Sequence, residues 1–364
     1  MSLRTVISKM VLLPCSKVYG FITFVRNKMY DARILPQNEF DIPVLVVGNL
    51  AVGGTGKTPH VEYIVEALRL NYHIAIVSRG YKRSTRGFVL ATPQSKPSDI
   101  GDEAYQMYHK FDCKITVAVC EDRTTAITEL QQIDPDINLI VMDDAFQHRR
   151  VKPTVSVILT EYRHPVFRDK MLPYGRLREG LYALNRADMV VVTKSPDTMP
   201  DYDYRHFMRD LNLFPYQSLF FSRFAYQALV PLFPEQSTAV PSLEWMTAAD
   251  SILAVAGVAN PRPFVRYLKS FQPKVRVNVF GDHHNFSRRD MEMLRERFRT
   301  MKGSTKILVT TEKDAVRMKA SPYFPPELRA HTFYLPIKVE FVNHNGLSFE
   351  QTLIKLIRDS KKLS

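Results

Sequence analysis

The chain alternates short, uninterrupted apolar runs with longer stretches in which apolar residues recur at helical spacing. Six of these runs lie at residues 42–47, 74–77, 115–119, 139–142, 155–159 and 189–193. Runs of this length that are rich in β-branched residues are typical of strands buried on both faces. After the first run, residues 59–70 have the spacing of a helix with one apolar face. Buried strands that alternate with helices predict an α/β fold with a mostly parallel sheet covered by helices.

The pattern changes after residue 212. Residues 213–234 are rich in Phe and Pro and are predicted to be a linker with short extended segments. Apolar runs at 252–256, 275–279 and 306–310, separated by helical patterns, then predict a smaller second α/β domain. We therefore predict a basic N-terminal segment over 1–38, a core over 39–212, a linker over 213–234 and a C-terminal domain over 235–364. A length of 364 residues is typical of two domains.

The N-terminal segment combines positive charge with apolar residues. Residues 1–35 carry six Lys and Arg residues against one acid, Asp31, and contain apolar runs at 10–13 and 18–25. These runs are too short to span a bilayer, and they lack the small-x-small cleavage site of a signal peptide. A basic amphipathic segment of this kind is suited to an anionic membrane surface. The alternative is a helix packed on the protein's own core.

The net charge is 50 − 37 = +13, and such an excess of positive charge indicates an anionic partner. The partner could be a nucleic acid, an acidic membrane or a phosphorylated substrate, and composition does not choose among them. The 45% hydrophobic and 24% charged residues are proportions of a globular protein with a sizeable core. Cys15, Cys113 and Cys120 are too few for a disulfide framework and are not at metal-ligand spacing. A reducing cytoplasm is therefore the expected compartment.

Residues 48–58 contain a relaxed Walker A motif between the first strand and the first helix, with Ala51 in place of the usual first glycine. Its glycines would turn backbone N–H groups toward phosphate oxygens at the start of a helix. Lys57 would reach the β- and γ-phosphates, and the Thr58 hydroxyl would bind Mg²⁺. The predicted phosphate-binding set is Ala51, Val52, Gly53, Gly54, Thr55, Gly56, Lys57 and Thr58. The motif predicts a P-loop NTPase core.

Carboxylates follow another strand of this core. Asp143 and Asp144 come at the end of the run 139–142, as in a Walker B element that holds Mg²⁺. Alternation along a strand points the two side chains to opposite sides, so only one is expected to bind the metal directly. Asp102 begins a helical stretch, and the residues alone favour a first-turn acid that complements the helix dipole.

Other classes of P-loop protein fit less well. A GTPase would need N/T-K-x-D at a strand end, and residues 193–196 break that pattern with Pro196. A P-loop ATPase acting on nucleic acid or in macromolecular assembly would explain the positive charge. However, the basic residues are dispersed and form no groove with interleaved aromatic residues. A non-catalytic nucleotide-binding membrane adaptor would leave the carboxylates idle.

Seven strings in order resemble the tetraacyldisaccharide 4'-kinases, which act on a lipid A precursor. They are residues 48–59, 78–81, 101–103, 143–148, 172–179, 282–284 and 311–316. The resemblance implies ATP- and Mg²⁺-dependent phosphorylation of the 4'-hydroxyl of a tetraacyldisaccharide 1-phosphate, giving lipid IVA. It also implies work at the cytoplasmic face of the bacterial inner membrane, on an anionic surface and without nucleic acid. Ala51, Ala104 and Ala145 depart from the family pattern, but none of these changes removes a reacting group.

The resemblance also implies roles for particular residues. It makes Asp102 the catalytic base, paired with His283 from the second domain, so that domain closure would complete the site. Lys57 would stabilise charge on the transferred phosphoryl group. Arginine forks suit a sugar phosphate, and tyrosine can stack on a sugar. The predicted substrate-binding residues are Arg79, Tyr81, Arg176 and Arg178. Arg149 and Arg150 are interpreted as a solvated basic surface.

Overall fold

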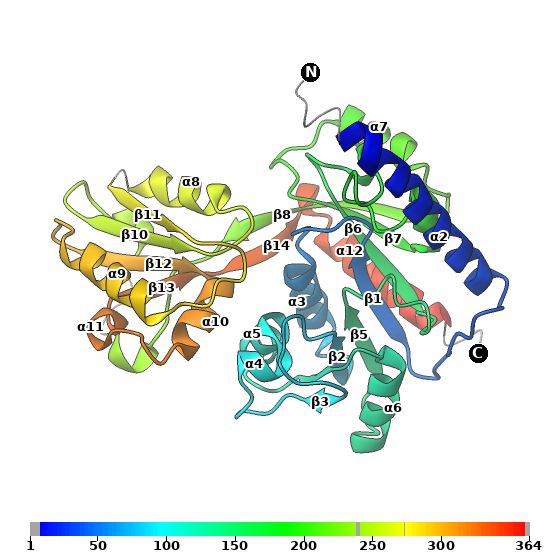
Figure 1. The fold of residues 1–364 in the computed structure, drawn as a ribbon, viewed down its shortest axis with the longest axis horizontal. Helices are drawn as coiled ribbons and strands as arrows, with labels where there is room; N and C mark the ends of the chain where they lie inside the picture. Colours follow the sequence, from blue (N-terminus) through cyan, green and yellow to red (C-terminus); the bar gives the residue numbers. More distant parts are fainter. Residues whose placement is uncertain (1–7, 238–240, 273, 361–364) are drawn as a thin grey trace.

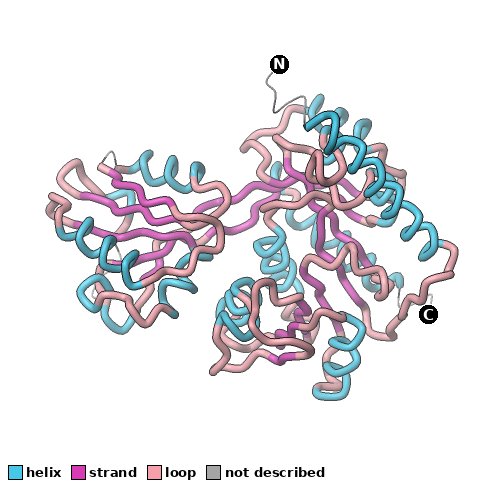
Figure 2. Tube along the Cα trace, viewed as in Figure 1, coloured by secondary structure: helices cyan, strands magenta, loops and turns pink. Residues whose placement is uncertain are grey.

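Two β-sheets organise the protein, and each forms the centre of one lobe (Figure 1). The structure is a computed structural model that describes residues 8–237, 241–272 and 274–360. Within these ranges, the first sheet has nine strands in the order β14-β8-β7-β6-β1-β5-β2-β4-β3. The second has five, in the order β11-β10-β12-β13-β9. Helices surround both sheets (Figure 2), and this architecture confirms the predicted α/β fold class.

The first sheet is parallel except at its two edge strands, β3 and β14. Its strands are β1 (Val44–Asn49), β2 (Ile74–Ser78), β3 (Val89–Leu90), β4 (Thr116–Val119), β5 (Leu139–Asp143), β6 (Val155–Glu161), β7 (Met189–Thr193), β8 (Ser218–Tyr226) and β14 (Ile337–Phe341). The helices of this lobe are α2 (Leu13–Asp31), α3 (Lys57–Leu68), α4 (Pro97–Ile100), α5 (Asp102–Lys110), α6 (Arg123–Ile133), α7 (Asp201–Leu211) and α12 (Gly346–Ser360).

The central strand β1 is apolar on both sides because both faces of its sheet are covered. Val44 and Val46 belong to the hydrophobic cluster on one face, and Leu45 and Val47 belong to the cluster on the other. All four side chains are 2% exposed or less. Uninterrupted apolar sequence is therefore a direct consequence of burial on both faces.

The second lobe repeats the arrangement on a smaller scale. Its strands are β9 (Val230–Pro231), β10 (Ser251–Ala256), β11 (Val275–Val279), β12 (Lys306–Thr311) and β13 (Thr332–Leu335). Its helices are α8 (Arg262–Phe271), α9 (Arg288–Arg299), α10 (Glu312–Ala320) and α11 (Pro326–Arg329). Only β9 pairs antiparallel within this sheet.

The sheet pairing differs from the predicted segmentation at two places. Residues 218–226, expected in a linker, form β8, which pairs with β7 in the first sheet. Near the C-terminus, β14 pairs antiparallel with β8, and α12 packs Phe349, Leu353 and Ile357 against the first lobe. Two strands therefore run between the lobes (Figure 1). The pairing of β14 with β8 joins segments more than a hundred residues apart in the sequence. No local sequence pattern predicts such a pairing.

Helix α2 lies along the outside of the first lobe (Figure 1). It is anchored by Ser16, Asn27 and Tyr30, which are buried. Most of its large apolar side chains instead face outward, among them Val18, Phe21, Ile22, Phe24 and Val25. Among the described residues, no helix has both the length and the apolar character that a membrane span needs. The segment is thus a packed helix that also presents an apolar outer face.

The interpretation of Arg149 as a solvated residue is wrong. Its side chain is 8% exposed and lies under α2. Its Nη1 donates hydrogen bonds to the Asn27 carbonyl at 3.0 Å and to Asp31 Oδ1 at 2.9 Å. Arg150 is exposed as expected, and its side chain pairs with Asp122. Arg149 therefore holds the C-terminal end of α2, a contact that depends on tertiary packing.

Candidate active site

Polar side chains, most of them buried, hold the loop between β1 and α3 in shape. Asn49 Nδ2 donates hydrogen bonds to the Ala51 carbonyl at 2.6 Å and to Thr55 Oγ1 at 2.9 Å. Thr193 Oγ1, at the end of β7, donates to the Thr55 carbonyl at 2.9 Å. Lys194 Nζ donates to the Gly54 carbonyl at 2.6 Å. The conformation of the loop is thus fixed by the protein's own hydrogen bonds.

The loop presents open backbone at the start of a helix. A Cβ atom added to Gly53 or Gly54 would meet no atom within 4 Å. Gly53 and Gly56 have φ of 121° and 92°, values that favour glycine. Within the predicted set, Gly53 and Gly54 are exposed, Ala51 and Thr55 are buried, and Val52, Gly56, Lys57 and Thr58 are intermediate. Free backbone at a helix N-terminus fits phosphate groups.

The segment around residues 176–178 braces this loop and brings one arginine to it. Val52 N donates to the Arg176 carbonyl at 2.8 Å. Arg178 Nη1 lies 3.1 Å from Asp144 Oδ1, and Lys57 Nζ lies 3.5 Å from Asp144 Oδ2. The Arg176 side chain points elsewhere, because its Nε pairs with Asp169 at 2.7 Å. The structure therefore brings Arg178, Asp144 and Lys57 together and leaves Arg176 apart.

Asp143 is the buried member of the carboxylate pair, with 1% of its surface exposed. Burial raises the pKa of Asp143 to about 8, and the negative charges of Glu103 and Asp144 act in the same direction. Among the described residues, its Oδ1 has no hydrogen-bond partner. A buried carboxylate oxygen without a partner fits a cation, because a cation would favour the charged form that burial disfavours.

Asp102 and His283 meet across the two lobes. His283 Nδ1 lies 3.3 Å from Asp102 Oδ2, and the two side chains are 12% and 19% exposed. Asp102 is the first residue of α5, and His283 lies in the loop between β11 and α9 with φ of 59°. A non-glycine residue in this left-handed region is held there by its surroundings, and such positions concentrate at functional sites.

Close backbone packing sets the position of Asp102. Gly101 precedes α5 with φ of 86°, and a Cβ at this position would lie 3.0 Å from Gly80 C and from the Tyr81 carbonyl oxygen. Glycine at position 101 therefore lets the turn after β2 approach the start of α5. The two strings 78–81 and 101–103 are brought together by this contact.

Two basic residues of α10 complete the contact between the lobes. Arg317 Nε donates to Asp102 Oδ2 at 2.7 Å, and its Nη1 donates to Asp314 Oδ1 at 3.0 Å. Lys313 Nζ lies 3.1 Å from His283 Nε2 and 3.2 Å from Glu103 Oε1. The Arg317 side chain is 3% exposed, so this charge is largely removed from water and is balanced by its two carboxylate partners.

Charged side chains surround both ring nitrogens of His283. The ammonium group of Lys313 can only donate, so Nε2 of His283 accepts its hydrogen bond. Nδ1 lies between an acceptor, Asp102 Oδ2 at 3.3 Å, and a donor, Arg317 Nη2 at 3.4 Å. Both the His283 contact and that of Arg317 Nε fall on Oδ2 of Asp102. Among the described residues, no hydrogen bond or ion pair involves Oδ1, which is the oxygen available to another molecule.

A model of the family described as tetraacyldisaccharide-1-P 4'-kinase matches residues 8–358 of the chain. Tetraacyldisaccharide 4'-kinase from Bacteroides thetaiotaomicron is 45% identical over 360 residues, covering 97% of this chain and 94% of that protein. A Porphyromonas gingivalis protein of the same name is 42% identical over 96% of this chain and 98% of its own length. The chain belongs to the tetraacyldisaccharide 4'-kinase family.

A solved structure supports the fold assignment. LpxK from Aquifex aeolicus, crystallised in complex with ATP, superposes with a TM-score of 0.72 and 24% sequence identity. The alignment covers 98% of this chain and all of that one. The two-lobed architecture is thus shared with a solved structure over nearly its full length.

Within this tetraacyldisaccharide 4'-kinase family member, the other predicted substrate residues, Arg79 and Tyr81, lie in the turn after β2. The Tyr81 ring contacts the His283 ring edge-on, with centroids 5.5 Å apart. Arg79 is exposed, and it lies near the buried Arg123. Burial lowers the pKa of Arg123, and the charge of Arg79 adds to that effect. Tyr81 therefore borders the Asp102–His283 pair.

Sequence reasoning did not assign roles to Lys313 and Arg317. Lys313 lies within the string 311–316 that carried part of the resemblance to the tetraacyldisaccharide 4'-kinases, whereas Arg317 follows it. Helical spacing supplies a signal for the pair, because residues four apart face the same side of a helix. The spacing does not reveal which residues contact that face of the helix. They are Glu103 and Asp102, which belong to the other lobe.

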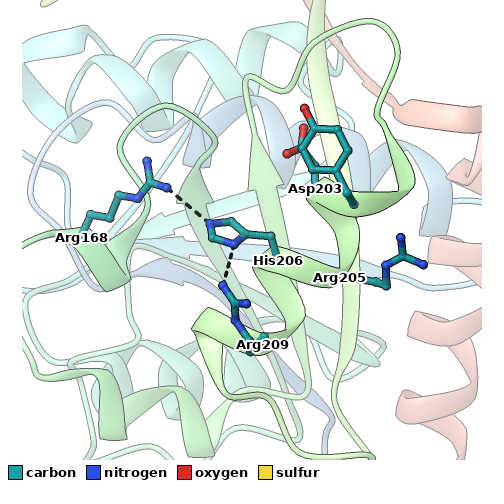
Figure 3. Close-up of a pocket in the computed structure, with 6 residues that line it drawn as sticks. Arg168, Asp203, Arg205, His206 and Arg209 are labelled. Atoms are coloured by element: carbon teal, nitrogen blue, oxygen red, sulfur yellow. Dashed lines mark hydrogen bonds between the residues drawn. The ribbon is translucent and has the colours of Figure 1, made fainter.

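Two cavities lie away from this kinase-family site. One is lined by side chains of α7 with Arg168 (Figure 3). The other lies beside α2 and is lined by Arg26, Tyr30, Glu121, Asp122, His148, Arg149 and Arg150. Neither set of lining residues includes the phosphate-binding loop or the Asp102–His283 pair.

Proposed function

We propose that the protein transfers the γ-phosphate of ATP to the 4'-hydroxyl of a tetraacyldisaccharide 1-phosphate, the lipid A precursor. Family membership over residues 8–358 supports this reaction, as does the fold shared with a protein crystallised with ATP. The observation that carries the proposal is the meeting of Asp102 and His283 across the two lobes. A hydroxyl acceptor needs a carboxylate or imidazole that can take its proton, placed beside a phosphate-binding loop.

In this mechanism Asp102 is the general base. Its Oδ1 accepts the proton of the sugar hydroxyl, while Oδ2 is held by His283 and Arg317. Fixing one oxygen orients the other toward the acceptor, so the reacting group is positioned before substrate binds. Because His283 and Arg317 belong to the second lobe, the site is complete only when the lobes are in contact.

Lys57 and Arg178 supply positive charge where the transferred group gains negative charge. Both side chains pair with Asp144. Preorganised cations of this kind stabilise the transition state more than the ground state. Asp144 positions the two cations, which leaves its neighbour Asp143 as the carboxylate for the metal.

Thr58 and Asp143 are the residues that would hold Mg²⁺. No group of three or more His, Cys, Asp or Glu residues suited to a metal ion exists among the described residues. Mg²⁺ commonly takes one or two protein ligands and completes its shell with water and phosphate oxygens. Bound Mg²⁺ would neutralise charge on the phosphate groups.

The substrate and the membrane set the remaining roles. Tyr81, beside His283, would contact the acceptor sugar, and the exposed side chain of Arg79 would bind an anionic group of the substrate. The outward apolar face of α2, with Lys17 and Lys28 on the same helix, would rest on the anionic cytoplasmic surface of the inner membrane. There the enzyme would meet its lipid substrate.

The decisive experiment measures transfer of labelled γ-phosphate from ATP to a tetraacyldisaccharide 1-phosphate in detergent micelles. We expect label in the lipid, and loss of that label in Asp102→Asn, which keeps the shape of the side chain. Release of free phosphate stimulated by nucleic acid, without labelled lipid, would instead support an ATPase acting on nucleic acid.

A further inference from the structure

The cavity in Figure 3 gathers positive charge on a surface that the proposed reaction does not use. It has a volume of about 540 Å³ and is lined by Arg168, Tyr202, Asp203, Arg205, His206 and Arg209. Arg168 ends the short helix η2 (Val166–Arg168), and the other five residues belong to α7. The acid of the set, Asp203, already accepts a hydrogen bond from Tyr162 at 2.6 Å. The lining of the cavity therefore contains three arginines and one aspartate, and the aspartate is already hydrogen-bonded.

Two guanidinium groups flank one imidazole ring at this cavity. Arg168 Nη2 lies 3.4 Å from His206 Nε2, and Arg209 Nη2 lies 2.9 Å from His206 Nδ1. Figure 3 shows these two arginines approaching the ring from different sides. Asp210 Oδ2 lies 3.2 Å from His206 Nε2, and Asp210 Oδ1 pairs with Arg209 Nε at 2.9 Å. Because a neutral imidazole has one acceptor nitrogen, Nε2 donates to Asp210 and Nδ1 accepts from Arg209, while Arg168 lies beside the ring with its donors free of it. Each guanidinium has five N–H donors, so several donors on each remain for a ligand. Paired guanidinium groups are suited to phosphate oxygens.

The cavity adjoins the helix with the outward apolar face. Met171, three residues after Arg168, accepts a hydrogen bond at 2.9 Å from Ser16 Oγ of α2. Gly20, one turn further along α2, packs against the side chain of Met171. On α7, Tyr202 and Tyr204 are 65% and 45% exposed. Exposed tyrosines beside an apolar helix are typical of the level of lipid headgroups.

We propose that this cavity binds the phosphate of an anionic phospholipid of the bilayer on which α2 rests. The inference rests on the proposed membrane association and adds a second contact to it. An apolar helix face alone leaves the protein free to rock about the helix axis. A phosphate held by Arg168 and Arg209, to one side of that axis, restricts this rotation. The cavity thus sets the orientation of the active site relative to the membrane.

The test compares two double variants of the full-length protein. Arg168→Gln/Arg209→Gln removes two charges at the cavity, and Arg288→Gln/Arg299→Gln removes two from exposed positions on α9 in the other lobe. Binding is measured to phosphatidylcholine vesicles with and without phosphatidylglycerol. We expect the cavity variant to bind the anionic vesicles roughly thirtyfold more weakly, since each of the two basic residues near the surface contributes about 1 kcal/mol. The α9 variant should bind as the wild type does.

Three results separate this site from its alternatives. Arg168→Lys/Arg209→Lys should recover most of the binding, which excludes a folding defect. An equal loss in the cavity and α9 variants would mean that net charge acts without a site, and the proposal would fail. Binding of the cavity variant to anionic vesicles at wild-type strength, while only its binding of inorganic phosphate is lost, would assign the cavity to a soluble anion.

An activity assay in detergent micelles without phospholipid distinguishes a failure of this lipid-binding proposal from a failure of the proposed function. The cavity variant should phosphorylate the disaccharide there with unchanged kcat and KM, because no bilayer lipid is involved. A raised KM for the disaccharide would place the substrate's own phosphate in the cavity and overturn the inference. Absence of lipid phosphorylation by the wild type would refute the proposed function and leave the vesicle result standing by itself.

Discussion

Arg317 in the second lobe donates a 2.7 Å hydrogen bond from its Nε to Oδ2 of Asp102 in the first. The same guanidinium binds Asp314, which is fully buried and accepts a 2.8 Å hydrogen bond from Gly257 N. His283 N in turn donates to the Gly257 carbonyl at 3.2 Å. The proposed base is therefore tied to the framework that carries its partner histidine.

Replacing Arg317 tests this connection. Arg317→Lys keeps the charge but has no planar fork to reach Asp102 and Asp314 together. Hydrogen bonds to charged groups contribute about 1.5–3 kcal/mol, so we expect kcat to fall roughly ten- to a hundredfold. Arg317→Gln should lower kcat further. The KM for ATP should stay unchanged in both variants, since the phosphate-binding loop is untouched. A proportionate rise in that KM would indicate general disruption instead of lost positioning.

The Asp102–His283 pair should act as one unit. Asp102→Ala and His283→Ala should each lower kcat by about 10²–10⁴, the range of general acid–base catalysis. The double variant should be little worse than the more damaged single variant, because residues that act together are strongly non-additive. Single-turnover rates with saturating ATP measure this. Additive losses, or normal turnover by the His283 variant, would leave the second lobe with a binding role only.

His60 predicts a pH dependence of stability. It lies under the phosphate-binding loop, where Nδ1 donates to the Gly56 carbonyl at 2.7 Å and Nε2 accepts from Ser222 Oγ at 2.8 Å. Burial lowers the pKa of His60 from 6.5 to about 4. The unfolded chain therefore binds a proton first, so stability is complete above pH 6.5 and falls as the pH drops from 6.5 toward 4.

The size of this effect is on the order of 3 kcal/mol at most. Denaturant unfolding at several pH values, for the wild type and His60→Asn, isolates it. The variant keeps a donor for Gly56 but does not titrate, so the stability difference between the two proteins should shrink in this pH range. A difference that stays constant with pH would show that folding does not lower the pKa of His60.

The outer face of α2 gives a prediction about membrane binding. Phe21 and Ile22 are 66% and 59% exposed, so Phe21→Ser/Ile22→Ser should leave the fold intact. Burying side chains of this size contributes about 1.5–3 kcal/mol each, and we expect vesicle binding to fall at least about tenfold. Trp245→Ser, at an 83% exposed position of the other lobe, is the control. Equal binding of all three proteins would reassign the apolar face to another partner.

Arg176 and Arg178, the two arginines of the string 172–179, show which features of the site the sequence can predict and which it cannot. A shared loop and a shared residue type predicted that Arg176 and Arg178 both contact substrate. In the structure, Arg178 joins Lys57 at Asp144, while Arg176 pairs with Asp169. The identity of the residue is local information, but its partner depends on which surface the loop covers.

The sequence by itself determined the features that burial and local geometry dictate. Strands covered on both faces must be apolar throughout, as in β1, and a phosphate-binding loop must have glycines where backbone approaches a ligand. Only the tertiary structure decided which distant segments meet. The return of β14 to β8 and the contact of Arg317 with Asp102, 215 residues away, both depend on how the lobes pack. Such contacts follow from the three-dimensional arrangement of whole surfaces, and no local pattern encodes them.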